Sequence, residues 1–266
     1  MPLGAAAQTD MEQEPEVGAR LAVSLDKKIA NGLHLSLEEE LRFDNNLSAF
    51  DRFHTTLAIN YKLLPYLKAG FGYALINGYS SSSSAFKSAR HRFFADVTGI
   101  YRLGDWQLSL RERLQGTLRT GDFNEYQNPQ TSWTLKSRLK VAYKGLRRWE
   151  PYASFELRNT FNAPIVNAVY NDATDTWGYY NGSTFTTTGN AGWFLDGFSG
   201  VYVNRLRGVL GTCYRINRHS TLEVSLMADY SIDKAIDANG KGTKLKAYTR
   251  ETGTTVWLCA GYGYSL

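Results

Sequence analysis

Apolar and polar residues alternate with a period of two along nearly the whole chain. In residues 33–43, for example, Leu33, Leu35 and Leu37 alternate with His34 and Ser36. Because successive side chains of a strand point to opposite faces, this pattern predicts β-strands with one apolar and one polar face. The polar face is dense in Arg, Lys and Glu, which is unusual for the solvent face of a soluble sheet.

Aromatic residues lie at both ends of the apolar face. In residues 51–62 the apolar phase begins at Phe53 and ends at Tyr61, eight residues later. At ~3.3 Å per residue and a tilt of roughly 40°, this spans about 20 Å. An apolar band between two aromatic girdles is typical of a transmembrane β-barrel, whereas a soluble β-sandwich is the alternative. The aromatic residues expected to point outward at the two rims are Phe53, Phe93, Trp133, Tyr61, Tyr101, Tyr143 and Tyr264.

Eleven segments carry the alternation, and short connections alternate with long ones between them. The strands are expected at residues 16–29, 33–43, 51–62, 66–77, 91–103, 105–118, 131–144, 151–161, 201–216, 220–232 and 253–265. The long connections are residues 44–50, 78–90, 119–130, 162–200 and 233–252. We therefore predict an all-β fold, a closed antiparallel transmembrane barrel of about 10–12 strands, with short periplasmic turns and longer extracellular loops.

The count of eleven leaves the parity of the barrel open. Bacterial single-chain barrels normally have an even number of strands. A missed strand, two merged strands or an N-terminal segment threaded through the lumen would each account for an odd count.

Bulk properties narrow the class and the location. No apolar run approaches the ~18–20 residues of a spanning helix, which leaves a closed barrel as the membrane-compatible fold. The net charge is +5, but the basic residues stand singly at inward strand positions, so nucleic-acid binding is not expected. Residues 1–15 are interpreted as a signal-peptide remnant, with Ala5, Ala6 and Ala7 at its cleavage site, followed by a disordered segment. Residues 16–266 form one barrel domain, expected in a bacterial outer membrane.

The two cysteines, Cys213 and Cys259, fall in the inward phase of their strands. One strand is expected between them, which separates them by roughly 9–10 Å and is too far for a disulfide. Neither has a second ligand at a spacing suited to zinc. We predict two free thiols, no metal site and no cofactor.

Several strand sequences resemble one known family. These are LEEELRF (37–43), DRFHTTLAINYKL (51–63), HRFFADVTGIYRLG (91–104), PYASFEL (151–157) and RLRGVLGTCYRI (205–216). They are similar to the uncharacterised outer-membrane barrel family known as domain of unknown function 2490, common in Bacteroidetes. The resemblance covers residues 16–266 and implies a barrel fold and an outer-membrane address, but no activity.

The inward phase holds the candidate functional residues. Its cations are Arg111, Arg113, Arg119, Lys136, Arg138 and Lys140, and its acids are Glu38, Glu40, Asp96, Glu156, Glu223 and Asp229. Rings of Arg and Lys would favour an anion-preferring diffusion channel. Alternatively, the charges pair and nearly close the lumen, because barrels of ~8 strands are filled by side chains and open channels are clear at ~16–18. We favour the narrow, mostly plugged interior, with the solute unknown.

Other functions rest on fewer residues. The long connection 162–200 is rich in aromatic residues and would suit recognition of a surface partner through a hairpin over the mouth. An enzyme is the least expected class, because no Ser or carboxylate is placed near His34, His54, His91 or His219, as a catalytic triad requires. No catalytic residue is predicted. The expected partners are outer-membrane lipid and neighbouring outer-membrane proteins.

Two acidic residues break the apolar phase. Glu39 and Glu112 fall at outward positions, where the middle of a bilayer tolerates charge poorly. Contact with a neighbouring protein would explain them. We favour a β-bulge that shifts each residue out of phase.

Overall fold

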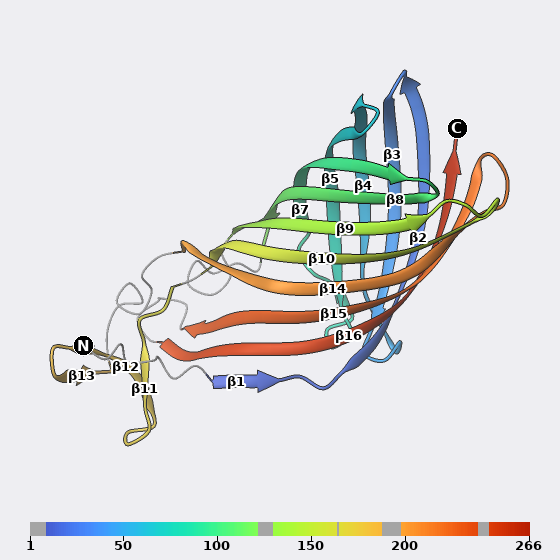
Figure 1. The fold of residues 1–266 in the computed structure, drawn as a ribbon. Helices are drawn as coiled ribbons and strands as arrows, with labels where there is room; N and C mark the ends of the chain where they lie inside the picture. Colours follow the sequence, from blue (N-terminus) through green and yellow to red (C-terminus); the bar gives the residue numbers. More distant parts are fainter. Residues whose placement is uncertain (1–8, 122–129, 164, 188–197, 239–244) are drawn as a thin grey trace.

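Eleven long strands curl into a closed barrel (Figure 1). The structure is a computed structural model and describes residues 9–121, 130–163, 165–187, 198–238 and 245–266. The barrel strands are β2 (Glu16–Ala30), β3 (Leu33–Asp44), β4 (Ala49–Leu64), β5 (Leu67–Ser80), β7 (Arg90–Leu103), β8 (Trp106–Arg119), β9 (Thr131–Tyr143), β10 (Trp149–Ala163), β14 (Gly200–Arg215), β15 (Ser220–Ala238) and β16 (Leu245–Ser265). The all-β barrel predicted from the alternation is confirmed.

The barrel closes through a parallel pair. β16 pairs with β2 in parallel, from Thr255 opposite Glu16 to Ser265 opposite Asp26, whereas all other barrel pairs are antiparallel. An odd number of strands forces this arrangement, because the first and last strands then run in the same direction. The expectation of a wholly antiparallel barrel is therefore wrong at this seam. The short strand β1 (Thr9–Glu12) extends the seam by pairing in parallel with the start of β16.

Short and long connections lie at opposite ends of the barrel. The β2–β3 turn contains Gly32 with a φ of 76°, a conformation that glycine adopts without strain. At the other end, β6 (Ala85–Phe86) pairs with the end of β5 inside the long 81–89 connection. We call these the short-connection end and the long-connection end.

The loop expected at 233–252 is wrong over residues 233–238 and 245–252, which are strand, whereas residues 239–244 lie outside the described residues. β15 and β16 stay paired far beyond the apolar band, with Ile232 opposite Thr252 and Asp237 opposite Ala247. β15 and β16, of 19 and 21 residues, are the longest strands of the barrel and run side by side in Figure 1. Its residues lack a continuous apolar phase, so the alternation that identified the other strands was absent here.

The outside of the barrel is an apolar belt. Rim aromatics Tyr61, Phe93, Tyr101, Trp133 and Tyr264 are exposed on the barrel surface. The two remaining rim aromatics are half-buried because Phe53 packs edge-on against Phe86 and Tyr143 packs against Trp106. Among the described residues there is no helix long and apolar enough to cross a membrane.

Glu39 and Glu112 lie on this apolar belt in regular strand register. Glu39 stands opposite Val23 and Thr55, and Glu112 opposite Val97 and Ser137, with no register shift near either residue. The bulge interpretation is therefore wrong. Each carboxylate accepts a hydrogen bond from a neighbouring strand: Thr55 Oγ1 donates to Glu39 at 3.0 Å, and Ser137 Oγ donates to Glu112 at 2.6 Å.

Part of the 162–200 connection forms a small sheet outside the barrel. It consists of β11 (Val169–Asn171), β12 (Thr176–Asn181) and β13 (Thr184–Thr186), and it lies at the long-connection end (Figure 1). Its Trp177 is buried with Ile236 and Tyr248 from the β15–β16 extension. This connection therefore contains antiparallel strand pairs, and they are anchored on the β15–β16 extension.

Candidate functional site

Two adjoining cavities occupy the barrel interior. The larger cavity, about 660 Å³, lies toward the long-connection end, and the smaller cavity, about 320 Å³, lies toward the short-connection end. Both are lined mainly by inward-facing polar and charged side chains. We call the residues that line both cavities the waist: Arg20, Arg42, Lys136, Glu156 and Arg207.

The predicted lumen residues gather around the smaller cavity. Nine of them line it: Glu38, Glu40, Arg111, Arg113, Lys136, Arg138, Lys140, Glu156 and Glu223. The other two acids, Asp96 and Asp229, are buried in ion pairs with lumen arginines. Arg119, at the end of β8, lines the larger cavity.

Asp229 is the centre of the strongest ion-pair network. Arg207 stands directly opposite it on β14 and donates Nε to Oδ1 at 2.6 Å and Nη2 to Oδ2 at 2.9 Å. Arg20 approaches the same carboxylate at 3.4 Å and Arg205 at 3.7 Å. Such a buried carboxylate, 4% exposed, is stable only when cations and donors surround it.

Two further carboxylates pair with cations at the waist. Glu156 accepts a hydrogen bond from Arg111 Nη2 at 3.1 Å and lies 3.8 Å from Arg207. Glu40 accepts from Arg42 Nε at 2.6 Å. Charged pairs therefore line the wall at the middle of the lumen, along one strand for Glu40 and between nearby strands for Glu156.

The smaller cavity mixes paired and unpaired charges. Arg113 forks onto Asp96, donating Nε at 2.8 Å and Nη2 at 2.6 Å to the same oxygen. Lys140 instead lies over the Tyr152 ring, 3.6 Å from its centroid. Arg138 makes no ion pair within 4.0 Å among the described residues. Eight cationic and four carboxylate side chains line this cavity.

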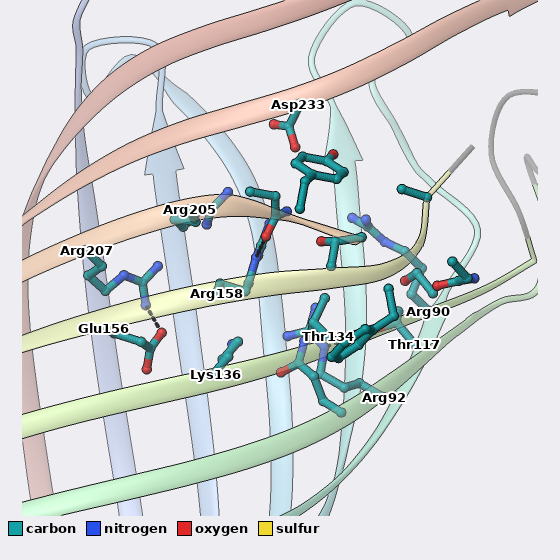
Figure 2. Close-up of a pocket in the computed structure, with 18 of the residues that line it drawn as sticks. Arg90, Arg92, Thr117, Thr134, Lys136, Glu156, Arg158, Arg205, Arg207 and Asp233 are labelled. Atoms are coloured by element: carbon teal, nitrogen blue, oxygen red, sulfur yellow. Dashed lines mark hydrogen bonds and ion pairs between the residues drawn. The ribbon is translucent and has the colours of Figure 1, made fainter. Parts of the chain in front are cut away.

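The larger cavity is far more cationic. Eleven Arg and Lys side chains and only three carboxylates line it, among its described residues. Figure 2 shows Arg90, Arg92, Lys136, Arg158 and Arg205 arranged around this space. Arg and Lys carry donors and no acceptor, so the cavity presents a surface suited to anions.

Most of these cations were missed from the sequence. They are Arg20, Arg42, Arg52, Arg90, Arg92, Arg158, Arg205, Arg207 and Lys234. The inward phase of the alternation identifies most of them. Arg158, for example, follows the inward-facing Glu156 by two residues on the same strand. Others lie at strand ends, such as Arg90, which the predicted strand 91–103 excluded.

The histidines have partners that the sequence did not reveal. His34 Nδ1 lies 2.8 Å from Asp26, and His54 Nδ1 lies 3.7 Å from Glu40. The expectation that no carboxylate would reach a histidine is therefore wrong. The third contact is between His91 and the Tyr73 hydroxyl at 2.7 Å, on the outer face. No described serine hydroxyl is hydrogen-bonded to these imidazoles.

Both thiols are free, as predicted. Cys213 stands opposite Glu223, and Cys259 stands opposite Ser225, so β15 separates the two cysteines.

The apolar belt, the closed strand order and the charged interior define a membrane-type β-barrel with a polar lumen. The chain belongs to the family described as "Protein of unknown function (DUF2490)", whose model matches residues 18–239. No curated protein matches this chain.

Two solved barrels are similar to it in outline. One is described as "NanC porin structure in rhombohedral crystal form", with 13% identity, a TM-score of 0.44 and coverage of 94% of this chain and 97% of that chain. The other is outer-membrane OmpT of Vibrio cholerae, with 10% identity, a TM-score of 0.34 and coverage of 82% and 60%.

Proposed function

We propose that the chain is a bacterial outer-membrane barrel that works as a small, anion-preferring diffusion channel and not as an enzyme. The observation that carries this proposal is the larger cavity, with eleven cationic and three carboxylate side chains. Charge of one sign along a low-dielectric passage concentrates counter-ions and rejects co-ions. The apolar belt with its aromatic rims supports the membrane location.

The paired waist sets how an anion would pass. Arg20 and Arg207 share the carboxylate of Asp229, and Arg42 pairs with Glu40, so the charge of these three cations is partly offset and their side chains narrow the passage. An anion would collect in the larger cavity and cross the waist slowly. We therefore expect low conductance together with clear anion preference. This combines the two interpretations of the lumen, a narrow interior and an anion-preferring channel.

Planar-bilayer recording of the refolded protein tests the proposal. Under a KCl gradient, the reversal potential should have the sign of chloride preference. Replacing Arg90 and Arg92 by Gln removes two cavity cations without a carboxylate within 4.0 Å among the described residues, and should move the reversal potential toward zero.

The matched control is Lys27→Gln with Arg147→Gln, which removes two exposed charges near the short-connection end. It should leave the reversal potential within error of wild type. Cation preference, or no conductance from protein that unfolds cooperatively, would contradict the channel.

A second candidate function is surface recognition. It is favoured by the ordered sheet β11–β13, which has its own contacts through Trp177 and presents Tyr180 with 56% of its surface exposed. Such a surface would suit a neighbouring outer-membrane protein. Cross-linking in native membranes from Tyr180→Cys, compared with Lys27→Cys on the far rim, tests it: a specific adduct at position 180 alone would support recognition.

A further inference from the structure

Four neighbouring strands place a cation at the same register inside the barrel. Arg113 on β8 stands opposite Lys136 on β9, Lys136 opposite Arg158 on β10, and Arg158 opposite Arg205 on β14. Directly opposite residues have Cβ atoms roughly 4.5–5.5 Å apart, and like charges at such positions are destabilising. A continuous row of four cations therefore needs a source of negative charge.

Each end of this row has a carboxylate within 4.0 Å, whereas the two central cations have none within that distance among the described residues. Arg113 is paired with Asp96, and Arg205 lies 3.7 Å from Asp229. Arg158 donates Nε to the neutral Asn204 amide oxygen at 2.7 Å and has no ion pair within 4.0 Å among the described residues, although Asp233 lies within electrostatic range of it. Lys136 has no ion pair within 4.0 Å among the described residues. Arg92, Glu156 and Arg158 lie within electrostatic range of it, but Glu156 is already paired with Arg111 and Arg207.

Arg92 is a third cation on the same wall, beside Lys136 and Arg158, without an ion pair within 4.0 Å among the described residues. Its Nε donates to Thr117 Oγ1 at 3.1 Å, again a neutral partner. Figure 2 shows Arg92, Lys136 and Arg158 lining the same cavity, with Thr134 between Arg92 and Lys136.

A buried hydroxyl faces this group without a partner. Thr134 is 8% exposed and lines the larger cavity, and its Oγ1 has no hydrogen-bond partner within the described protein. Thr160, directly opposite on β10, has an unpartnered Oγ1 as well. Buried polar groups are nearly always hydrogen-bonded, so an unpartnered pair beside free cations points to a ligand with acceptor oxygens.

We infer that Arg92, Lys136, Arg158 and the Thr134 hydroxyl form a binding subsite for a small, doubly charged oxyanion, such as phosphate or a dicarboxylate. A guanidinium and an ammonium bind carboxylate and phosphate oxygens by charge-assisted hydrogen bonds, and the hydroxyl donates to a further oxygen. A double negative charge offsets the repulsion of Lys136 and Arg158 better than chloride does. The subsite deepens the proposed function, because it requires a lumen that solutes enter.

Isothermal titration of the refolded full chain in detergent tests the subsite, with inorganic phosphate at pH 8 and succinate as probes and chloride at equal ionic strength as reference. Wild type should show saturable binding of both probes. Lys136→Gln with Arg158→Gln should weaken it about tenfold or more, since each lost charged hydrogen bond is worth roughly that factor.

Two further variants separate binding from folding. Thr134→Val keeps the shape and charge of the wall, and should weaken probe affinity several-fold with unchanged unfolding in probe-free buffer. Lys27→Gln with Arg147→Gln removes the same net charge at exposed positions and should leave affinity unchanged. Without probe, the Lys136/Arg158 variant should unfold at the same or higher urea concentration than wild type, because it relieves like-charge repulsion.

Three outcomes would overturn the subsite: no saturable heat with wild type, equal binding of chloride, or an equal loss of affinity in the Lys27/Arg147 control. Anion-selective conductance without saturable probe binding would remove the subsite and leave the channel. Saturable probe binding by a protein that does not conduct would support the subsite and contradict the channel.

Discussion

Arg113 and Arg138 occupy neighbouring strands and line the same cavity, but among the described residues only Arg113 of the two has a carboxylate within 4.0 Å. The partner, Asp96, is 9% exposed and directly opposite on β7. Removing one member of a buried pair costs ~3–5 kcal/mol, less where lumen water reaches the remaining charge. Arg113 should therefore contribute more than Arg138 to the free energy of unfolding.

We predict that Arg113→Ala lowers the free energy of unfolding by about 2–4 kcal/mol, whereas Arg138→Ala changes it by less than ~1 kcal/mol. Arg138→Ala should instead reduce anion preference in bilayer recordings. Urea unfolding in lipid vesicles and reversal potentials measure the two effects. Equal destabilisation by both variants would mean that Arg138 has a carboxylate partner.

Glu39 and Glu112 place carboxylates on the outer, apolar face of the barrel and not in its polar lumen. Glu112 lies midway along the outward phase of β8, between Trp106 and Leu118, with Ser137 as its hydrogen-bond donor. A carboxylate at this depth is unfavourable in hydrocarbon. We predict that Glu112→Leu combined with Ser137→Val raises the free energy of unfolding by up to ~2 kcal/mol in vesicles. A loss of stability would show instead that the Glu112–Ser137 pair meets a partner in the membrane.

Which lumen charges pair could not be derived from the sequence. Alternation places Asp229 and Arg20 inside the barrel, but their contact joins residues 209 positions apart and depends on strand order and shear. The neighbouring pair Arg207–Asp229 depends on a single register between β14 and β15. Side-chain phase is a local property, whereas ion pairing across a lumen is a property of the closed barrel.

At the scale of elements, the parallel β2–β16 seam is the feature that an odd strand number requires. Ala22 and Gly261 stand opposite each other across it, and a Cβ on Gly261 would lie 3.9 Å from Ala22 Cβ. That separation matches the Cβ–Cβ distance of a disulfide, ~3.5–4.5 Å. The same Cβ would be 3.9 Å from its nearest other neighbours, so the substitution fits without a clash.

We predict that Ala22→Cys with Gly261→Cys forms an intramolecular disulfide on mild oxidation, in a background with Cys213 and Cys259 replaced by Ser. A gel shift between reduced and oxidised protein measures it. The control is Ala22→Cys with Ser225→Cys, in which β16 separates the two positions by roughly 9–10 Å, too far for a bridge. Absence of the Ala22–Gly261 bridge in folded protein would show that β2 does not close the barrel.

The strands themselves were predictable wherever one of their faces belongs to the apolar belt. β8, for instance, was expected at 105–118 and spans Trp106–Arg119. The β15–β16 extension was not, because residues 233–238 and 245–252 lie beyond the apolar belt, where their pairing continues the register of the strands within the belt. Pairing beyond the belt leaves no hydrophobic period to detect.

At the scale of the whole molecule, the odd strand count places the start of β2 and the end of β16 at opposite ends of the barrel. β2 starts at the long-connection end, where the Gln13 amide donates to the Thr252 carbonyl oxygen at 2.8 Å. β16 finishes at the short-connection end, where the Ser265 amide donates to His219 O at 2.8 Å. Barrels in the outer membrane carry their long connections outside the cell, so this topology predicts an external position for Glu14.

Cysteine labelling on intact cells tests this orientation, in the background with Cys213 and Cys259 replaced by Ser. Ser82→Cys in the long 81–89 connection and Glu14→Cys should both react with a membrane-impermeant maleimide, whereas Arg147→Cys at the short-connection end should react only after permeabilisation; all three positions are exposed. Labelling at 147 alone would invert the barrel. Labelling at 82 without 14 would place the N-terminal segment on the inner side, which is incompatible with a parallel β2–β16 seam and would require a twelfth strand.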